Sequence, residues 1–132
     1  MGVGEAMIVA GVGCRKGARG ADIEAAVAAA LARAGLGAAA LDLIATSAAK
    51  GGEPGIVGAA STMGVQLVVI SQGELEAASA RAATRSERVI ALTGVPSVAE
   101  AAALAAAGPT ARLIVARVAV GPATCALAEA TS

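Results

Sequence analysis

The sequence contains no phenylalanine, tyrosine or tryptophan, and it contains no histidine. Without aromatic rings, the chain lacks the stacking surfaces on which single-stranded nucleic acids bind. Without imidazole, it has no Ser–His or Cys–His nucleophile pair, no histidine metal ligand and no side chain that normally titrates near pH 7. Any chemistry must therefore use aspartate, glutamate, lysine, arginine, cysteine or backbone amides.

The chain also lacks net charge, because ten lysines and arginines balance ten aspartates and glutamates. No long-range field recruits nucleic acid, and we expect no nucleic-acid partner. The start of the chain carries Glu5 and no basic segment, unlike a signal peptide. Pro54 and several glycines interrupt the uncharged run 54–73. We therefore expect no membrane span and no membrane partner.

Cysteine is scarce as well, and the two present, Cys14 and Cys125, are far apart in the sequence. They match no metal-binding spacing, and we expect no metal site and no cofactor. Free thiols are typical of a reducing compartment, so the sequence predicts a cytoplasmic protein.

Hydrophobic residues make up 57% of the chain, and its 132 residues are typical of one domain. We therefore treat 1–132 as a single domain whose core consists of alanine, valine, leucine and isoleucine. A domain of this size buries roughly two-thirds of the surface that its unfolded chain exposes.

Short apolar runs alternate with helical periodicity along the chain, which predicts an α/β fold. Three Ser/Thr-x-x-Glu patterns, Ser71–Glu74, Thr84–Glu87 and Ser97–Glu100, are typical of helix N-termini. We expect a three-layer α/β/α domain with a mixed, largely parallel sheet of about five strands. The predicted strands are 7–13, 41–47, 65–71, 111–120 and 123–130, and the predicted helices are 21–35, 53–64, 72–80, 85–92 and 97–107.

The stretch "GVGCRKG" at 11–17 joins the first predicted strand to the first predicted helix. Its glycines do not have the G-x-G-x-x-G spacing of dinucleotide-binding folds, and no acidic residue ends the second predicted strand. No Gly-Lys-Ser/Thr triplet occurs, which also excludes a phosphate-binding P-loop.

A cationic edge remains. Arg15, Lys16 and Arg19 follow the first predicted strand, and Lys50 follows the second. Ligands of parallel α/β sheets bind outside the carboxyl ends of the strands, where these two groups should meet. Guanidinium groups bind carboxylates through paired hydrogen bonds and ammonium groups supply point charge. The alternative is that these cations form an ordinary solvated surface.

Three motifs give the chain a resemblance to a known family. "GVGCRKG" at 11–17, "ATSAAKGGEPGI" at 45–56 and "TGVPSVAEAAAL" at 93–104 resemble, in order and spacing, the C-terminal domain shared by the cobalamin-biosynthesis proteins CobE and CbiG. The resemblance covers almost the whole chain. It implies a role in making the corrin ring of vitamin B12.

The resemblance implies a function but leaves three possibilities open. In two-part members of the family, this domain follows an N-terminal portion, and the whole opens a lactone on a cobalt-corrinoid and releases acetaldehyde. This chain resembles the stand-alone form, for which we expect binding of a polycarboxylate corrinoid or precorrin intermediate. The second possibility is a precorrin lactone hydrolase, and the third is a non-catalytic partner that docks on another pathway enzyme.

The resemblance also assigns candidate residues to a ligand site. Arg117 stands where relatives often carry lysine. The ligand-binding candidates are Gly13, Cys14, Arg15, Lys16 and Gly17 in the first motif, Lys50 and Glu53 in the second, and Glu100 in the third.

Each chemically active candidate has a structural alternative. Cys14 is either a nucleophile whose pKa Arg15 and a helix N-terminus lower, or a small thiol that fills a turn. Lys50 and Glu53 are either the electrophile and base of lactone opening or a surface ion pair. Glu100 is a third catalytic candidate, but the Ser-x-x-Glu pattern by itself explains a glutamate there, and we favour the helix cap.

Overall fold

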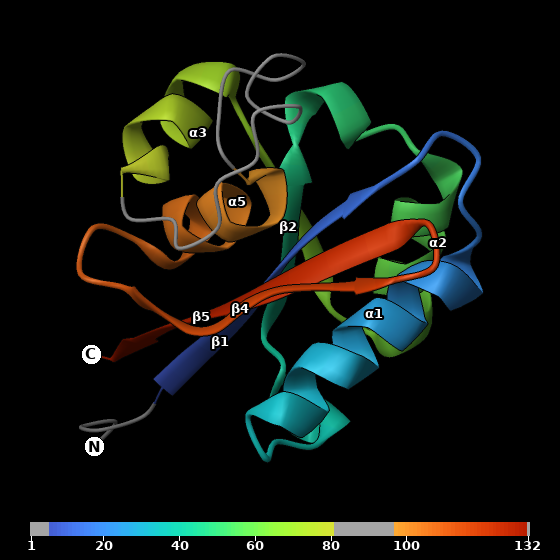
Figure 1. The fold of residues 1–132 in the computed structure, drawn as a ribbon, viewed down its shortest axis with the longest axis horizontal. Helices are drawn as coiled ribbons and strands as arrows, with labels where there is room; N and C mark the ends of the chain where they lie inside the picture. Colours follow the sequence, from blue (N-terminus) through green and yellow to red (C-terminus); the bar gives the residue numbers. More distant parts are fainter. Residues whose placement is uncertain (1–5, 81–96, 132) are drawn as a thin grey trace.

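A five-stranded mixed sheet forms the middle layer of the protein (Figure 1). The structure is a computed structural model and describes residues 6–80 and 97–131. The strand order is β3-β2-β1-β5-β4. The strands are β1 (Ala6–Cys14), β2 (Leu43–Ser47), β3 (Gln66–Ile70), β4 (Arg112–Val120) and β5 (Ala123–Thr131).

Four of the five strands run in the same direction. β1 pairs with β2 and β2 with β3 in parallel, whereas β5 is antiparallel to both β1 and β4. Because β4 is antiparallel to a strand that is itself antiparallel to β1, it has the direction of β1. The carboxyl ends of β1, β2 and β3 therefore lie at one edge of the sheet, as the sequence predicts.

In the described part of the chain, helices cover both faces of the sheet (Figure 1). α1 (Gly20–Arg33) and α2 (Pro54–Met63) pack on one face, against side chains such as Ile8, Val12 and Ile44. α3 (Gln72–Ser79) and α5 (Val98–Ala107) cover the other face, against Val9 and Ala45. The alternation along β1 and β2 between these two cores is the period of two that a β-strand imposes. Short 3₁₀ turns, η1 (Ala38–Ala40) and η2 (Ala48–Lys50), flank β2.

The lack of large core side chains brings α5 very close to the sheet. A Cβ atom at Gly11 of β1 would overlap the carbonyl oxygen of Ala99 and lie 2.6 Å from the backbone nitrogen of Ala103. Glycine on the strand and alanine on the helix allow this close approach of the two backbones. This packing positions α5, with the Ser97–Glu100 motif at its start, over β1.

The predicted fold class is confirmed, and the described elements lie within a few residues of their predicted bounds. The predicted helix 85–92, with its Thr84–Glu87 pattern, lies outside the described residues. The Gly-Pro turn between the last two strands is present, and Gly121 adopts φ 57° there. Within 6–80 and 97–131, no helix has the length and apolar character needed to cross a bilayer.

Candidate functional site

The loop between β1 and α1 carries three exposed cations, Arg15, Lys16 and Arg19, at the carboxyl edge of the sheet. The Arg15 backbone N–H donates to the carbonyl oxygen of Pro122 at 2.9 Å, which attaches the loop to the β4–β5 turn. Lys16 is followed by Gly17, whose φ of 81° is a left-handed conformation that favours glycine. The Pro122 contact thus fixes the start of the loop, while the Arg15 and Lys16 side chains face solvent.

Gly13 precedes this loop as the penultimate residue of β1. Its carbonyl oxygen accepts a hydrogen bond from the Thr124 hydroxyl at 3.3 Å, and a Cβ atom at Gly13 would lie 3.0 Å from that hydroxyl oxygen. Gly13 therefore allows the β4–β5 hairpin to lie against the end of β1.

The loop between β2 and α2 contributes Lys50 and Glu53. Lys50 ends the 3₁₀ turn η2, and its carbonyl oxygen accepts from the Glu53 N–H at 3.0 Å. Glu53 immediately precedes Pro54, the first residue of α2. Proline suits this first helical position. Both Lys50 and Glu53 are half-buried.

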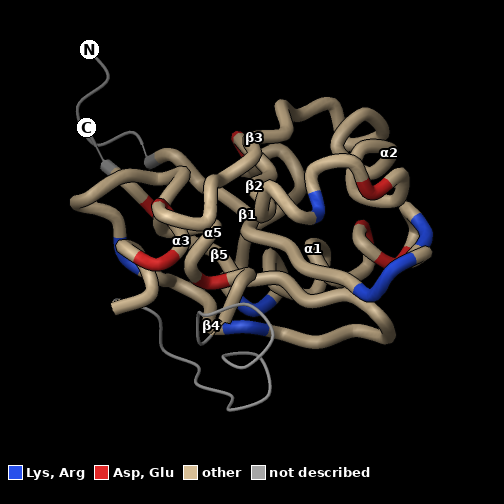
Figure 2. The backbone as a smooth tube through the Cα atoms, turned by 90° about the horizontal axis from the view of Figure 1, so that it is seen from above, with Lys and Arg blue, Asp and Glu red and all other residues tan. Residues whose placement is uncertain are grey.

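The two loops are in direct contact. The Gly17 backbone N–H donates to Glu53 Oε1 at 2.7 Å, and the two partners are 36 positions apart in the sequence. A Cβ atom at Gly55 would overlap the carbonyl oxygen of Ala18 and lie 3.1 Å from its carbonyl carbon. The absence of a side chain at Gly55 therefore allows the start of α2 to lie against the β1–α1 loop. Viewed from above, charged residues of both signs lie in the loops beside α2 (Figure 2).

Cys14 ends β1 next to this contact and is half-buried. Burial raises the pKa of the Cys14 thiol, the charge of Lys50 lowers it, and the charge of Glu53 raises it. The net direction is upward, so the hypothesis that its surroundings lower this pKa is wrong. A neutral thiol is a poor nucleophile. The charges of Lys50 and Glu53 therefore both affect the pKa of Cys14.

Lys50 and Glu53 do not form the surface ion pair that we considered from the sequence. In the part of the chain that the structure describes, the ion pairs are Arg19–Asp22 at 3.3 Å and Arg112–Glu129 at 3.2 Å. The Arg19–Asp22 pair belongs to the start of α1. A hydrogen bond from the Arg19 backbone N–H, and to a lesser extent one from the Arg19 side chain, lower the pKa of Asp22 there.

Glu100, near the start of α5, takes part in a different set of contacts. The Ser97 hydroxyl accepts from the Glu100 N–H at 3.3 Å, so Ser97 caps α5 as predicted. The Glu100 side chain does not complete the capping box, so the helix-cap role that we favoured for it is wrong. The Glu100 carboxylate reaches another element, since its Oε2 accepts from the backbone N–H of Arg117 in β4 at 2.8 Å, and Glu100 is fully buried. This contact with β4 is separate from the contact between Gly17 and Glu53.

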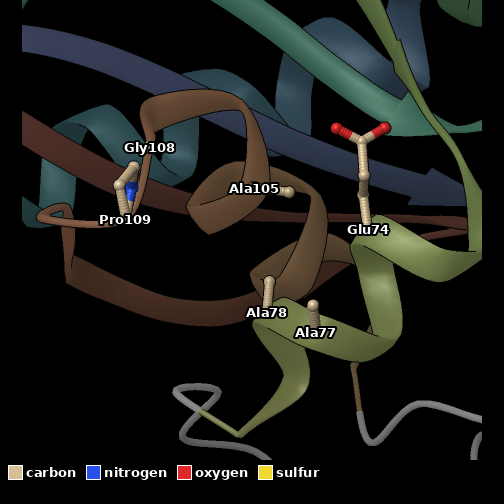
Figure 3. A pocket seen from close by; sticks show the side chains of 6 residues that line it. All are labelled: Glu74, Ala77, Ala78, Ala105, Gly108 and Pro109. Carbon is tan, nitrogen blue, oxygen red and sulfur yellow. The ribbon is translucent and has the colours of Figure 1, made fainter.

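A pocket lies on the other side of the molecule, between α3 and the end of α5 (Figure 3). Its volume is about 350 Å³, and none of the predicted site residues lines it. The lining contains one carboxylate and no cation, which does not suit an anionic ligand. The lining residues are Glu74, Ala77, Ala78, Ala105, Gly108 and Pro109. Within 6–80 and 97–131, no three His, Cys, Asp or Glu side chains are grouped to hold a metal ion.

The structure adds Gly55 and Pro122 to the residues that build the site, and neither was a candidate from the sequence. Gly55 has a weak signal, since a glycine just inside a helix lowers helix stability and needs a packing reason. Pro122 has none, because its carbonyl contact with Arg15 depends on how the hairpin folds back.

Comparison with known proteins gives consistent matches over nearly the whole chain. Residues 8–128 match the protein family described as "Cobalamin synthesis G C-terminus". The curated "Protein CobE" of Sinorhizobium sp is 40% identical over 121 residues, which cover 92% of this chain and 79% of that protein.

Two solved structures are also similar to this chain. The 1.7 Å crystal structure of CobE, a protein from the cobalamin (vitamin B12) biosynthetic pathway, has a TM-score of 0.89 and 32% identity. That match covers 96% of this chain and 93% of the solved one. Cobalamin biosynthesis protein chiG from Agrobacterium tumefaciens str. C58 has a TM-score of 0.73 and 40% identity, and the match covers 92% and 97% of the two chains.

Proposed function

The chain belongs to the family of the cobalamin synthesis G C-terminus and is a protein of cobalamin biosynthesis, and we propose that it binds a polycarboxylate corrinoid or precorrin intermediate. The observation that carries this proposal is the contact between the β1–α1 and β2–α2 loops. Arg15 and Lys16 directly precede Gly17 in the first loop, and the Gly17 backbone amide donates to the Glu53 carboxylate of the second loop at 2.7 Å.

The chemistry of such a ligand matches this edge of the sheet. Corrin precursors carry acetate and propionate side chains around a largely apolar macrocycle. An arginine binds a carboxylate through two parallel hydrogen bonds, and a lysine adds point charge at variable distance. Arg15 and Lys16 are exposed and form no ion pair among the described residues, so both are free to bind carboxylates.

The candidate residues then divide into different roles. Arg15, Lys16 and Lys50 supply positive charge, while Gly13 and Gly17 give the loop its shape. Cys14 contributes a neutral thiol at the base of the loop, because its pKa is raised. A role for Glu100 in ligand binding stays a prediction, and its full burial against β4 supports a structural role instead. We also propose a cytoplasmic location, which the free thiols of Cys14 and Cys125 support.

Replacing both loop cations tests the proposal. We expect the double variant Arg15→Ala/Lys16→Ala to bind a mid-pathway precorrin about 30-fold more weakly. Each exposed charge-assisted contact contributes about 1 kcal/mol, and two contacts give about 2 kcal/mol. Arg33→Ala is the matched control, because Arg33 is an exposed cation at the far end of α1. Equal affinity of the double variant and the wild type would contradict the proposal.

Two different results would identify the hydrolase or the docking protein instead. Release of a small aldehyde from a lactone-bearing precorrin would indicate a hydrolase, with Lys50 and Glu53 as the residues to replace next. Co-purification of a pathway enzyme, without any pigment, would indicate a docking protein. Either result, in the absence of stable precorrin binding, would replace the binding function that we propose.

A further inference from the structure

The β1–α1 loop already holds a carboxylate, and this carboxylate belongs to the protein itself. The Gly17 N–H donates to Glu53 Oε1 at 2.7 Å, a length typical of a hydrogen bond to a charged acceptor. The hydrogen bond is exposed to solvent, and Arg15 and Lys16 precede it in the same loop. The Glu53 carboxylate therefore occupies a position that suits the carboxylate of a ligand.

Few interactions hold the Glu53 side chain in this position. It forms no ion pair among the described residues and, although Glu53 is the N-cap residue of α2, its side chain makes no capping hydrogen bond. A single solvent-exposed hydrogen bond of this kind contributes about ten-fold to an equilibrium. A ligand carboxylate that approaches Arg15 and Lys16 can therefore displace the Glu53 side chain at small cost.

We propose that Glu53 is an internal competitor for the ligand, and that a ligand carboxylate replaces it at the Gly17 amide. This inference rests on the proposed function, since it requires an anionic ligand. One carboxylate takes the place of another, so the amide keeps a charged acceptor while the Glu53 side chain turns toward solvent. A macrocycle whose side chains are neutral amides offers a weaker acceptor and displaces Glu53 less well. The exchange thus selects for free carboxylates.

Uroporphyrin, a tetrapyrrole with eight carboxylates, is a suitable probe because its visible absorbance reports binding directly. We expect Glu53→Ala to bind uroporphyrin about five-fold more tightly than the wild type, because the competing acceptor is gone. Glu53→Gln should lie between the two, since its amide oxygen still accepts from the Gly17 N–H but without charge. Glu24→Gln is the matched control, because it removes a negative charge near the start of α1 and leaves the Gly17 contact intact.

Two results of this titration would overturn the inference. Weaker binding by Glu53→Ala would mean that Glu53 contacts the ligand favourably. An equal gain in Glu24→Gln and Glu53→Ala would mean that only overall charge matters, and that the Gly17 contact has no part in it.

A second measurement separates this inference from the proposed function. The Gly17 amide signal is followed by nuclear magnetic resonance during a titration with citrate, a small tricarboxylate. In Glu53→Ala, citrate should shift this signal at about five-fold lower concentration than in the wild type. If no variant binds a tetrapyrrole but citrate acts at Gly17 in this way, the proposed function fails and the inference stands. If citrate leaves the Gly17 signal of Glu53→Ala unchanged, the inference fails.

Discussion

Two glycines of α2 provide a direct test of how the site is built. Gly55 lies against Ala18 of the β1–α1 loop, whereas a Cβ atom at Gly58 would meet nothing within 4 Å in the described part of the chain, apart from the neighbouring backbone of its own helix. Both residues belong to the same helix, so the helical preference of alanine acts at both positions, less strongly at Gly55 in the first turn than at Gly58. The pair Gly55→Ala and Gly58→Ala therefore separates the packing of the two loops from the intrinsic stability of the helix.

The structure sets the size of the expected difference. Replacing a helical glycine by alanine contributes about 0.5–1 kcal/mol, so Gly58→Ala should raise the free energy of unfolding by that amount. At Gly55, the new methyl group meets the carbonyl group of Ala18, which is backbone and cannot rotate away. Overpacking costs roughly 1–3 kcal/mol, and we expect the upper end here. The net effect of Gly55→Ala is then a loss of about 2 kcal/mol.

Urea denaturation followed by far-ultraviolet circular dichroism measures both variants, since the chain has no aromatic residue for fluorescence. Gly55→Ala should also weaken ligand binding, because the new methyl group displaces the β1–α1 loop, which carries Arg15 and Lys16. Gly58→Ala should bind as the wild type does. If Gly55→Ala is as stable as Gly58→Ala and binds normally, the two loops do not meet as described, and the site is wrong.

Two further predictions concern individual side chains. Because the pKa of Cys14 is raised above the ordinary thiol value of 9.0, Cys14 should react appreciably with iodoacetamide only above pH 9.0. Lys50→Gln should slow this alkylation, since the Lys50 charge lowers the pKa, and Glu53→Gln should accelerate it. The opposite order would contradict the placement of these charges beside Cys14. Glu100→Ala should lower the free energy of unfolding by about 2–3 kcal/mol, since Arg117 loses an acceptor, whereas Glu100→Gln keeps one and should cost less. Equal losses in urea denaturation would show that the Glu100 charge itself is needed.

The sequence predicted the fold well because the determinants of the described elements are local. The runs 7–13, 41–47 and 65–71 are confirmed as the adjacent parallel strands β1, β2 and β3. Short apolar runs bounded by glycine and polar residues favour buried strands. The same reasoning predicted that the β1–α1 loop and Lys50 share one edge. What the pattern left open was the spatial contact between two loops that lie 36 residues apart at Gly17 and Glu53.

Side-chain partners were harder to predict for physical reasons. The pattern Ser97-x-x-Glu100 is compatible both with a capping box and with a glutamate that reaches another element, and the sheet decides the outcome through Arg117. The pKa of Cys14 depends on the balance between burial and the charges of Lys50 and Glu53, which local sequence does not contain. Residues whose role depends on tertiary distances are therefore the ones that required the structure.

The central claim, that this protein binds a polycarboxylate corrinoid at the Arg15–Lys16 loop, is tested most directly by gel filtration with a mid-pathway precorrin. Because the chain has no aromatic residue, the protein is almost transparent in the near ultraviolet and visible ranges, and the absorbance that co-elutes with it belongs to the ligand. We expect stoichiometric colour with the wild type at low salt. High salt should remove it, because salt screens the exposed charges. Wild-type protein that elutes colourless with every available precorrin would contradict the claim.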